Sequence, residues 1–172
     1  GRKFLYPGCG YGGSCFPKDI KALIHTAEEV GYPMQILHAV EAVNERQKRV
    51  LFDKLLRHFG NDLKGRRIAL WGIAFKPETD DIREAPSMTL IELILKECRR
   101  KWGDRIRYGS DMYDAITDAD ALLLVTEWKE FRLPSWSVVE RLMRTPILFD
   151  GRNIYDRHDF EGSRFTYYCI GN

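Results

Sequence analysis

The stretch IALWGIAF, residues Ile68 to Phe75, decides the fold because it is apolar throughout. A continuous apolar run is typical of a strand buried on both faces of a parallel sheet. Similar runs recur at 121–126 and 147–149, with a weaker one at 166–170. Helical patterns lie between them, at 87–102 and 135–144. This alternation predicts a doubly wound α/β domain with a parallel sheet over residues 61–172.

Charged loops follow the first and third of these runs. Lys76 opens one loop, and Arg152 lies in the other. Ligands of such sheets bind beyond the carboxyl ends of the strands. The two side chains are therefore candidates to grip an anion such as a pyrophosphate, Arg152 through a bidentate fork and Lys76 as a point charge. Ordinary solvated loop charges are the alternative.

A glycine-rich loop, GCGYGGSC at residues 8–15, precedes a predicted helix that begins around Pro17. Cys15 thus lies just before a helix N-terminus, where free N–H groups and the helix dipole favour a thiolate, and Lys18 adds positive charge. We interpret Cys15 as a nucleophile, with an inert buried cysteine as the alternative. The glycine spacing also fits a dinucleotide fingerprint, but no hydrophobic strand precedes it.

A second helical pattern covers residues 34–59. As one helix it would be roughly 40 Å long, which suits a connector between domains or a contact between subunits. Two shorter helices broken near Asn44 are the alternative. Residues 1–60 are accordingly assigned to a separate helical segment.

Composition narrows the function classes. The chain has 172 residues and a formal net charge of +2, with basic and acidic residues interspersed, so nucleic acid is not an expected partner. Its four cysteines lack a zinc-like or disulfide-framework spacing, which indicates a reduced, cytoplasmic protein without a metal site. No apolar run approaches a membrane span. The chain opens on Gly1 within a loop, which predicts a fragment.

Five segments together resemble the UDP-glucose/GDP-mannose dehydrogenase family, most closely its UDP-glucose branch. They are GYGGSCFPKD, AVEAVNERQ, GIAFKPETDDIREAPS, DADALLLVTEW and FDGRNIYD, in the family's order over nearly the whole chain. The resemblance implies NAD-dependent oxidation of UDP-glucose to UDP-glucuronate in two hydride transfers. Cys15 would add to the intermediate aldehyde as a thiohemiacetal and then carry a thioester that water hydrolyses.

The resemblance also assigns roles residue by residue. Asp19 matches the family aspartate that positions or activates water. Lys18 and Arg83 match positions that approach NAD. The helix over 34–59 matches a homodimer core, and the following domain matches a UDP-binding domain. The positions that match substrate contacts are Phe4, Leu5, Tyr6, Pro7, Gly8, Gly12, Lys76 and Arg152.

Several family features are missing from the sequence. They are the N-terminal NAD-binding Rossmann domain, a lysine and an asparagine of the central region, and an arginine shortly before Phe4. A second strand is also missing near Cys98, either lost from the domain or omitted from the sequence. The chain alone is therefore expected to be inactive. The alternatives are a dehydrogenase for GDP-mannose or another nucleotide sugar, and a noncatalytic UDP-binding or dimerisation module.

Overall fold

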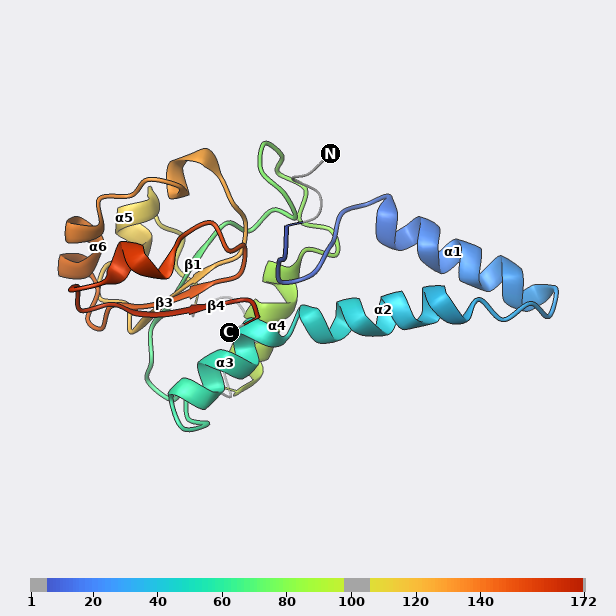
Figure 1. The fold of residues 1–172 in the computed structure, drawn as a ribbon, viewed down its shortest axis with the longest axis horizontal. Coiled ribbons are helices and arrows are strands. Elements are labelled where there is room, and N and C mark those ends of the chain that lie inside the picture. The colour runs from blue at the N-terminus through green and yellow to red at the C-terminus, as the bar shows by residue number, and fades with distance from the viewer. Residues whose placement is uncertain (1–5, 98–105, 172) are drawn as a thin grey trace.

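The computed structural model describes residues 6–97 and 106–171. Its helices are α1 (Phe16–Glu29), α2 (Gln35–Gln47), α3 (Val50–His58), α4 (Pro86–Glu97), α5 (Met112–Ile116) and α6 (Trp136–Leu142), with 3-10 turns η2 (Lys129–Phe131) and η3 (Arg157–Phe160). Its strands are β1 (Ile68–Trp71), β2 (Ala121–Leu124), β3 (Ile147–Asp150) and β4 (Thr166–Cys169). Figure 1 shows a layered α/β body from which α1 and α2 project.

The four strands form one parallel sheet in the order β1-β2-β3-β4. Side chains of β2 and β3 are fully or almost fully buried along both strands, as their apolar runs predict. Alternate residues enter two hydrophobic clusters, one on each face. The helices α3 and α4 cover the first cluster, whereas α5, α6 and η3 cover the second. The predicted α/β class with helices on both faces is confirmed.

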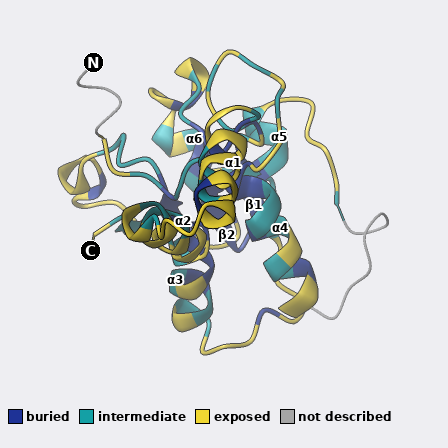
Figure 2. Cartoon of the chain, turned by 90° about the vertical axis from the view of Figure 1, so that its right-hand side faces the viewer, coloured by how far each residue is buried: buried dark blue, intermediate teal, exposed yellow. Residues whose placement is uncertain are grey.

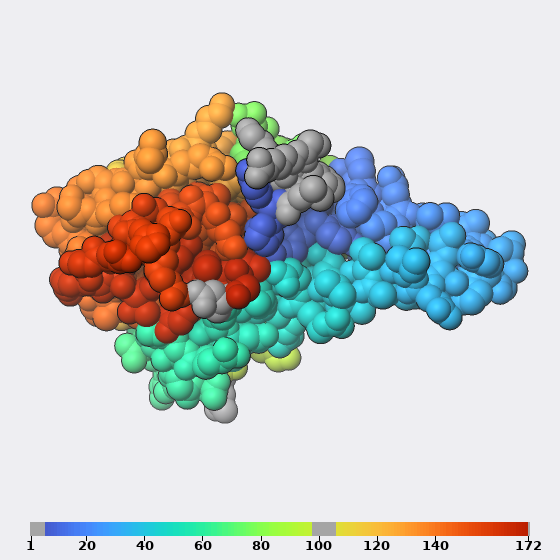
Figure 3. Space-filling model, in the orientation of Figure 1, coloured from blue at the N-terminus to red at the C-terminus, as the bar shows by residue number. Residues whose placement is uncertain are grey.

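The helices α1 and α2 form a hairpin that stands out from the α/β body (Figures 1 and 3). Most of its surface is exposed, as the colouring of Figure 2 shows. Large apolar side chains on it face solvent, among them Val30 and Ile36. Among the described residues, no helix is long and apolar enough to cross a bilayer.

The predicted single helix over 34–59 is wrong, because α2 ends at Gln47 and α3 begins at Val50. The break falls at Lys48 and Arg49, the last two residues of the polar run that begins at Asn44. Lys48 explains it: this side chain is only 4% exposed and turns inward to carboxylates of Glu45 and Glu84. The polar run thus marks a helix junction.

The first predicted strand is shorter than its apolar run. It ends at Trp71 because Gly72 takes a φ of +86°, and a Cβ there would lie 2.4 Å from the Thr126 side chain. The remaining residues to Phe75 form a loop. Cys98, where the sequence suggests a missing strand, lies outside the described residues.

Leu51 tests the packing of α3 on the sheet. It is fully buried, so Leu51→Ala should lower the free energy of unfolding by about 2–5 kcal/mol through lost burial and a cavity. Leu133→Ala is the matched control, because Leu133 is 94% exposed. Urea unfolding followed by circular dichroism measures both, and similar values for the two variants would contradict the packing described.

Candidate functional site

The glycine-rich loop lies across the carboxyl ends of the strands. The Cys9 N–H donates to the Gly151 carbonyl at 2.9 Å, and the Cys9 thiol lies 3.8 Å from the Val125 carbonyl. Cys9 has no exposed surface, and burial raises the pKa of its thiol to about 11. Gly151 makes room for it, since a Cβ there would lie 3.1 Å from the Cys9 sulfur. Cys9 is therefore a neutral anchor that fixes the loop to the sheet.

This anchoring brings Gly8 to Arg152. A Cβ on Gly8 would lie 2.7 Å from Arg152 Nη1, so only glycine lets the loop approach this edge of the guanidinium so closely. Glu127, which follows β2, occupies the other edge: Nη2 donates to its Oε1 at 2.8 Å, and Nε lies 2.7 Å from its Oε2. The Arg152 N–H donates to Asp150 at 2.8 Å. The cation is held with its Nη1 edge turned toward the glycine-rich loop.

Two side chains of α2 hold the same loop from the other side. Asn44 is buried, accepts from the Tyr11 N–H at 2.8 Å and donates to the Tyr11 carbonyl at 3.3 Å. Gln47 donates to the Gly8 carbonyl at 2.7 Å. An amide that satisfies both backbone groups of one residue fixes its position without secondary structure.

Cys15 occupies the N-cap position of α1, as predicted. Its side chain is exposed, and its sulfur lies 3.7 Å from the Ser14 hydroxyl. The Asp19 N–H donates to the Cys15 carbonyl at 2.8 Å, which puts Asp19 one turn into the helix. The Asp19 carboxylate is exposed beside Lys18, at 3.4 Å. The thiol thus stands at the positive end of a helix of 14 residues, open to a reactant.

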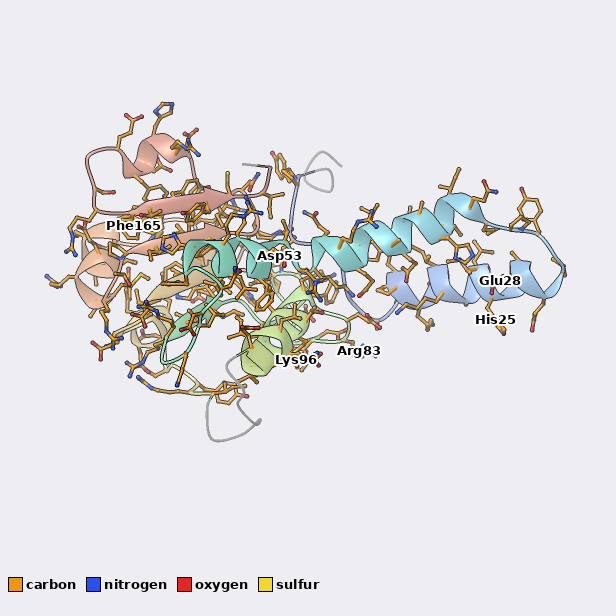
Figure 4. The ribbon with its side chains drawn as sticks, turned by 90° about the horizontal axis from the view of Figure 1, so that it is seen from below. His25, Glu28, Asp53, Arg83, Lys96 and Phe165 are labelled. Carbon is orange, nitrogen blue, oxygen red and sulfur yellow. The ribbon has the colours of Figure 1, made fainter. Side chains whose placement is uncertain are left out.

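The predicted cofactor residues Lys18 and Arg83 share one hollow of about 510 Å³, lined also by Gly13, Ser14, Lys21 and Glu84. Figure 4 shows Arg83 on the loop between β1 and α4, near the start of α1. Asp81 orients its guanidinium, accepting from Nε at 3.0 Å and Nη2 at 2.8 Å. The hydrogen bonds from Arg83 lower the pKa of Asp81 to about 2, with a smaller contribution from Ser14. The hollow is therefore cationic and adjoins the residue before Cys15.

Lys76 is exposed, and its Nζ lies 5.3 Å from the centre of the Phe75 ring. That ring packs on Gly13, where a Cβ would lie 2.8 Å from it. Lys76 and Arg152 lie in separate loops at the same end of the sheet, after β1 and β3, and the structure does not bring these two candidates together in a hydrogen bond. Tyr6 and Pro7 are exposed before the loop, Gly12 is buried in it, and Phe4 and Leu5 lie outside the described residues.

Three features define the class of protein: a helical hairpin, a cysteine loop and a parallel α/β domain. The cysteine loop lies on the strand ends of that domain. Residues 1–46 match the central domain of the UDP-glucose/GDP-mannose dehydrogenase family, and residues 69–102 and 94–157 match its UDP-binding domain. The chain belongs to this family.

Relatives agree with this assignment. The chain is 48% identical to a UDP-glucose 6-dehydrogenase of Pseudomonas aeruginosa, over 99% of this chain and 42% of that protein. It is 37% identical to UDP-glucose 6-dehydrogenase TuaD of Bacillus subtilis, over 99% of this chain and 40% of that protein. A solved UDP-glucose dehydrogenase from Pyrobaculum islandicum superposes with a TM-score of 0.81 at 29% identity, covering 98% of this chain and 39% of that one.

The chain therefore spans about two fifths of the length of these relatives. The match to the Pseudomonas protein extends over 190 positions, more than the 172 residues of this chain. The alignment to this relative therefore includes positions with no counterpart in this chain.

Sequence reasoning missed three supports of the site. Cys9, Asn44 and Glu127 hold the loop or Arg152, yet none was singled out for a role. Asn44 offered a signal, because an asparagine on the apolar side of a helix needs partners when it is buried. Glu127 offered a weaker one, since a carboxylate directly after a buried strand lies at the ligand-binding edge.

Removing the Asn44 amide tests the support of the cysteine loop. Asn44→Ala leaves the Tyr11 N–H without its acceptor, which should lower the free energy of unfolding by about 1–3 kcal/mol and speed hydrogen exchange at the Tyr11 amide. Gln35→Ala, on the exposed start of the same helix, should do neither. Unchanged protection of Tyr11 in the Asn44 variant would contradict the anchoring.

Proposed function

We propose that this chain is the cysteine-bearing and UDP-binding part of an NAD-dependent UDP-glucose 6-dehydrogenase, which oxidises UDP-glucose to UDP-glucuronate. The observation that carries the proposal is the seating of the Cys15 loop on the strand ends, with its Gly8 against Arg152. One loop thereby carries the cysteine that matches the family nucleophile and contacts the arginine that matches a family substrate cation. The identities of the relatives as UDP-glucose 6-dehydrogenases support the substrate.

The substrate is held through its charged diphosphate. Arg152 offers its Nη1 edge beside Gly8, and Lys76 supplies a second cation from the β1–α4 loop. The family resemblance assigns further substrate contacts to Phe4, Leu5, Tyr6, Pro7, Gly8 and Gly12. Cations suit this role because guanidinium and ammonium groups bind phosphate oxygens by charge-assisted hydrogen bonds.

Cys15 makes the second oxidation feasible. Its thiolate adds to the carbonyl carbon of the aldehyde formed in the first oxidation, giving a thiohemiacetal whose carbon carries a hydride that can leave. Loss of that hydride gives a thioester, and water then hydrolyses it, releasing the carboxylate and the free thiol. Asp19, one helical turn from Cys15, positions or activates that water.

The residues fit a dinucleotide. Lys18 and Arg83 line one cationic hollow next to Ser14, which suits a pyrophosphate. When bound, NAD supplies the hydride acceptor for both oxidations. Its main binding domain belongs to the part of the relatives that this chain does not span, so the chain by itself is expected to be inactive.

The chain is further proposed to act in the cytoplasm as a homodimer formed through the helices of 34–59. The exposed apolar side chains of the hairpin support a contact there, since solvent-facing groups such as Val30, Ile36 and Val43 gain by burial. Cys9, Cys15 and Cys169 are free thiols, in keeping with a reducing compartment.

Calorimetry with UDP tests the substrate site on this chain. Lys76→Ala and Arg152→Ala should each weaken binding about 10- to 100-fold, because each removes a charged partner of the diphosphate. Lys64→Ala is the control, since Lys64 is an exposed lysine that precedes β1, at the opposite end of the sheet. Absence of UDP binding by the folded chain would leave only a dimerisation module.

Cys15→Ser in the complete enzyme tests covalent catalysis. The hydroxyl is a far weaker nucleophile at neutral pH, so steady-state formation of UDP-glucuronate should fall by at least about 100-fold. UDP affinity should stay unchanged as the control. Turnover at the wild-type rate would rule out the thioester route.

GDP-mannose or another nucleotide sugar is the alternative substrate within the same family. Comparing turnover of UDP-glucose and GDP-mannose by the complete enzyme separates them. A preference for the guanine nucleotide would replace the proposed substrate and leave the role of Cys15 intact.

A further inference from the structure

Glu84 lies where three segments of the chain meet. Its carboxylate is 3.1 Å from Lys21 Nζ of α1 and 3.2 Å from Lys48 Nζ at the α2–α3 junction. Glu84 itself belongs to the β1–α4 loop. The two ammonium groups lower the pKa of Glu84, that of Lys21 most, so the carboxylate is charged at neutral pH. The Glu84 side chain therefore joins the α1–α2 hairpin, the α2–α3 junction and the α/β body.

The Glu84 backbone is pressed on the cysteine loop. Its carbonyl lies so close to Gly12 that no Cβ could stand between them. The neighbouring carbonyl of Arg83 accepts from the Gly13 N–H at 2.8 Å. Residues 83–84 and 12–13 thus pack backbone to backbone.

This packing holds Glu84 in an unfavourable conformation. Its φ is +53°, in the left-handed region that non-glycine residues seldom adopt. Such a conformation persists only where the surroundings over-determine it, and it is found most often at functional sites. The two lysines supply the restraint.

Lys48 makes the restraint hard to release. Its side chain is 4% exposed, and its ammonium lies between Glu45 at 2.9 Å and Glu84 at 3.2 Å. Removing one partner of a buried charge is costly, because the charge that remains is poorly solvated. The Lys48 stem also lies under Gly10, with its Cγ 3.0 Å from where a Cβ would stand. The same lysine thus touches both loops.

We propose that Glu84 is a positioning residue that keeps Arg83 beside Cys15. It does so by tying the loop that carries Arg83 to the two helices that flank the cysteine loop. The backbone of Arg83 is hydrogen-bonded to Gly13, two residues before Cys15, and its side chain lines the hollow that Ser14 also lines. This inference rests on the proposed function for the importance of Cys15 and Arg83, but the geometry that it invokes needs no nucleotide.

Glu78 offers a matched comparison in the same loop. It also has a left-handed φ, of +62°, and it also pairs with a lysine, Lys129, at 2.9 Å. Its partner belongs to η2 and not to the segments around Cys15. A change at Glu78 therefore removes an ion pair from a residue with a left-handed φ, as a change at Glu84 does. It does not remove a link to the cysteine loop.

The experiment measures the alkylation rate of Cys15 by iodoacetamide in the intact chain, read by peptide mass spectrometry over a range of pH. The thiolate is the reacting form, so a nearby cation accelerates the reaction. Glu84→Gln should slow it about threefold near neutral pH, the size expected for losing one exposed charge interaction. Arg83→Ala should slow it equally, and adding Glu84→Gln to Arg83→Ala should not slow it further. Glu78→Gln should leave the rate unchanged.

The sign of the effect separates the explanations. Removing a negative charge near the thiol, by itself, would speed alkylation, and so would a loosened loop. A rate in Glu84→Gln equal to or above wild type therefore overturns the proposal. Glu84→Asp keeps the charge and tolerates the left-handed φ, but is too short to span both lysines. It should also slow the reaction, and if Glu84→Gln does not fold, an unchanged rate in Glu84→Asp overturns the proposal.

The two sets of tests fail independently. Loss of UDP binding in calorimetry would undermine the proposed substrate while leaving the Glu84 result standing. Normal UDP binding together with unaltered Cys15 reactivity in the Glu84 variants would overturn the Glu84 proposal and leave the proposed substrate standing.

Discussion

The backbone hydrogen bond from Cys9 to Gly151 is the contact on which the candidate site depends. It joins the cysteine loop to the residue directly after β3, and the buried Cys9 side chain fills the space that Gly151 leaves. Because the loop ends in α1, this bond also sets where that helix begins. Cys15, Lys18 and Asp19 all lie in its first turn or just before it. A rigid sheet thus positions a reactive end of an otherwise exposed hairpin.

Much of the α/β part was predictable because burial on two faces leaves a clear pattern. All four apolar runs became parallel strands, and the helix after Cys15 began where Pro17 indicated. The lengths were less predictable. The apolar run that begins at Ile68 continues past the end of its strand. The strand ends before Gly72, where a left-handed φ brings the chain close to Thr126. Nothing in local apolarity reports such a tertiary contact.

The helix junction at Lys48 shows a second limit of sequence reasoning. Residues 34–59 have a helical pattern on both sides of a polar run, which fits one helix or two. The choice depends on Lys48 turning inward to Glu84, a residue from a different segment. A pairing across the chain also decides the orientation of Arg152, held by Glu127, whereas Arg83 is held by Asp81 only two residues away. The candidate cations were visible in the sequence, but their pairing with these carboxylates was not.

The carboxylates of Glu127, Asp81 and Glu84 have different roles at the edge of the sheet. Glu127 and Asp81 each cover one side of a guanidinium, so each guanidinium keeps a fixed direction. Preorganisation of this kind lowers the ordering cost of binding. Glu84 differs from them, since it pairs with both Lys21 and Lys48 and so joins the β1–α4 loop to α1 and to the α2–α3 junction. The directions of the two guanidinium groups are therefore set by the ion pairs of Glu127 and Asp81, whereas the ion pairs of Glu84 connect the segments that carry the candidate site.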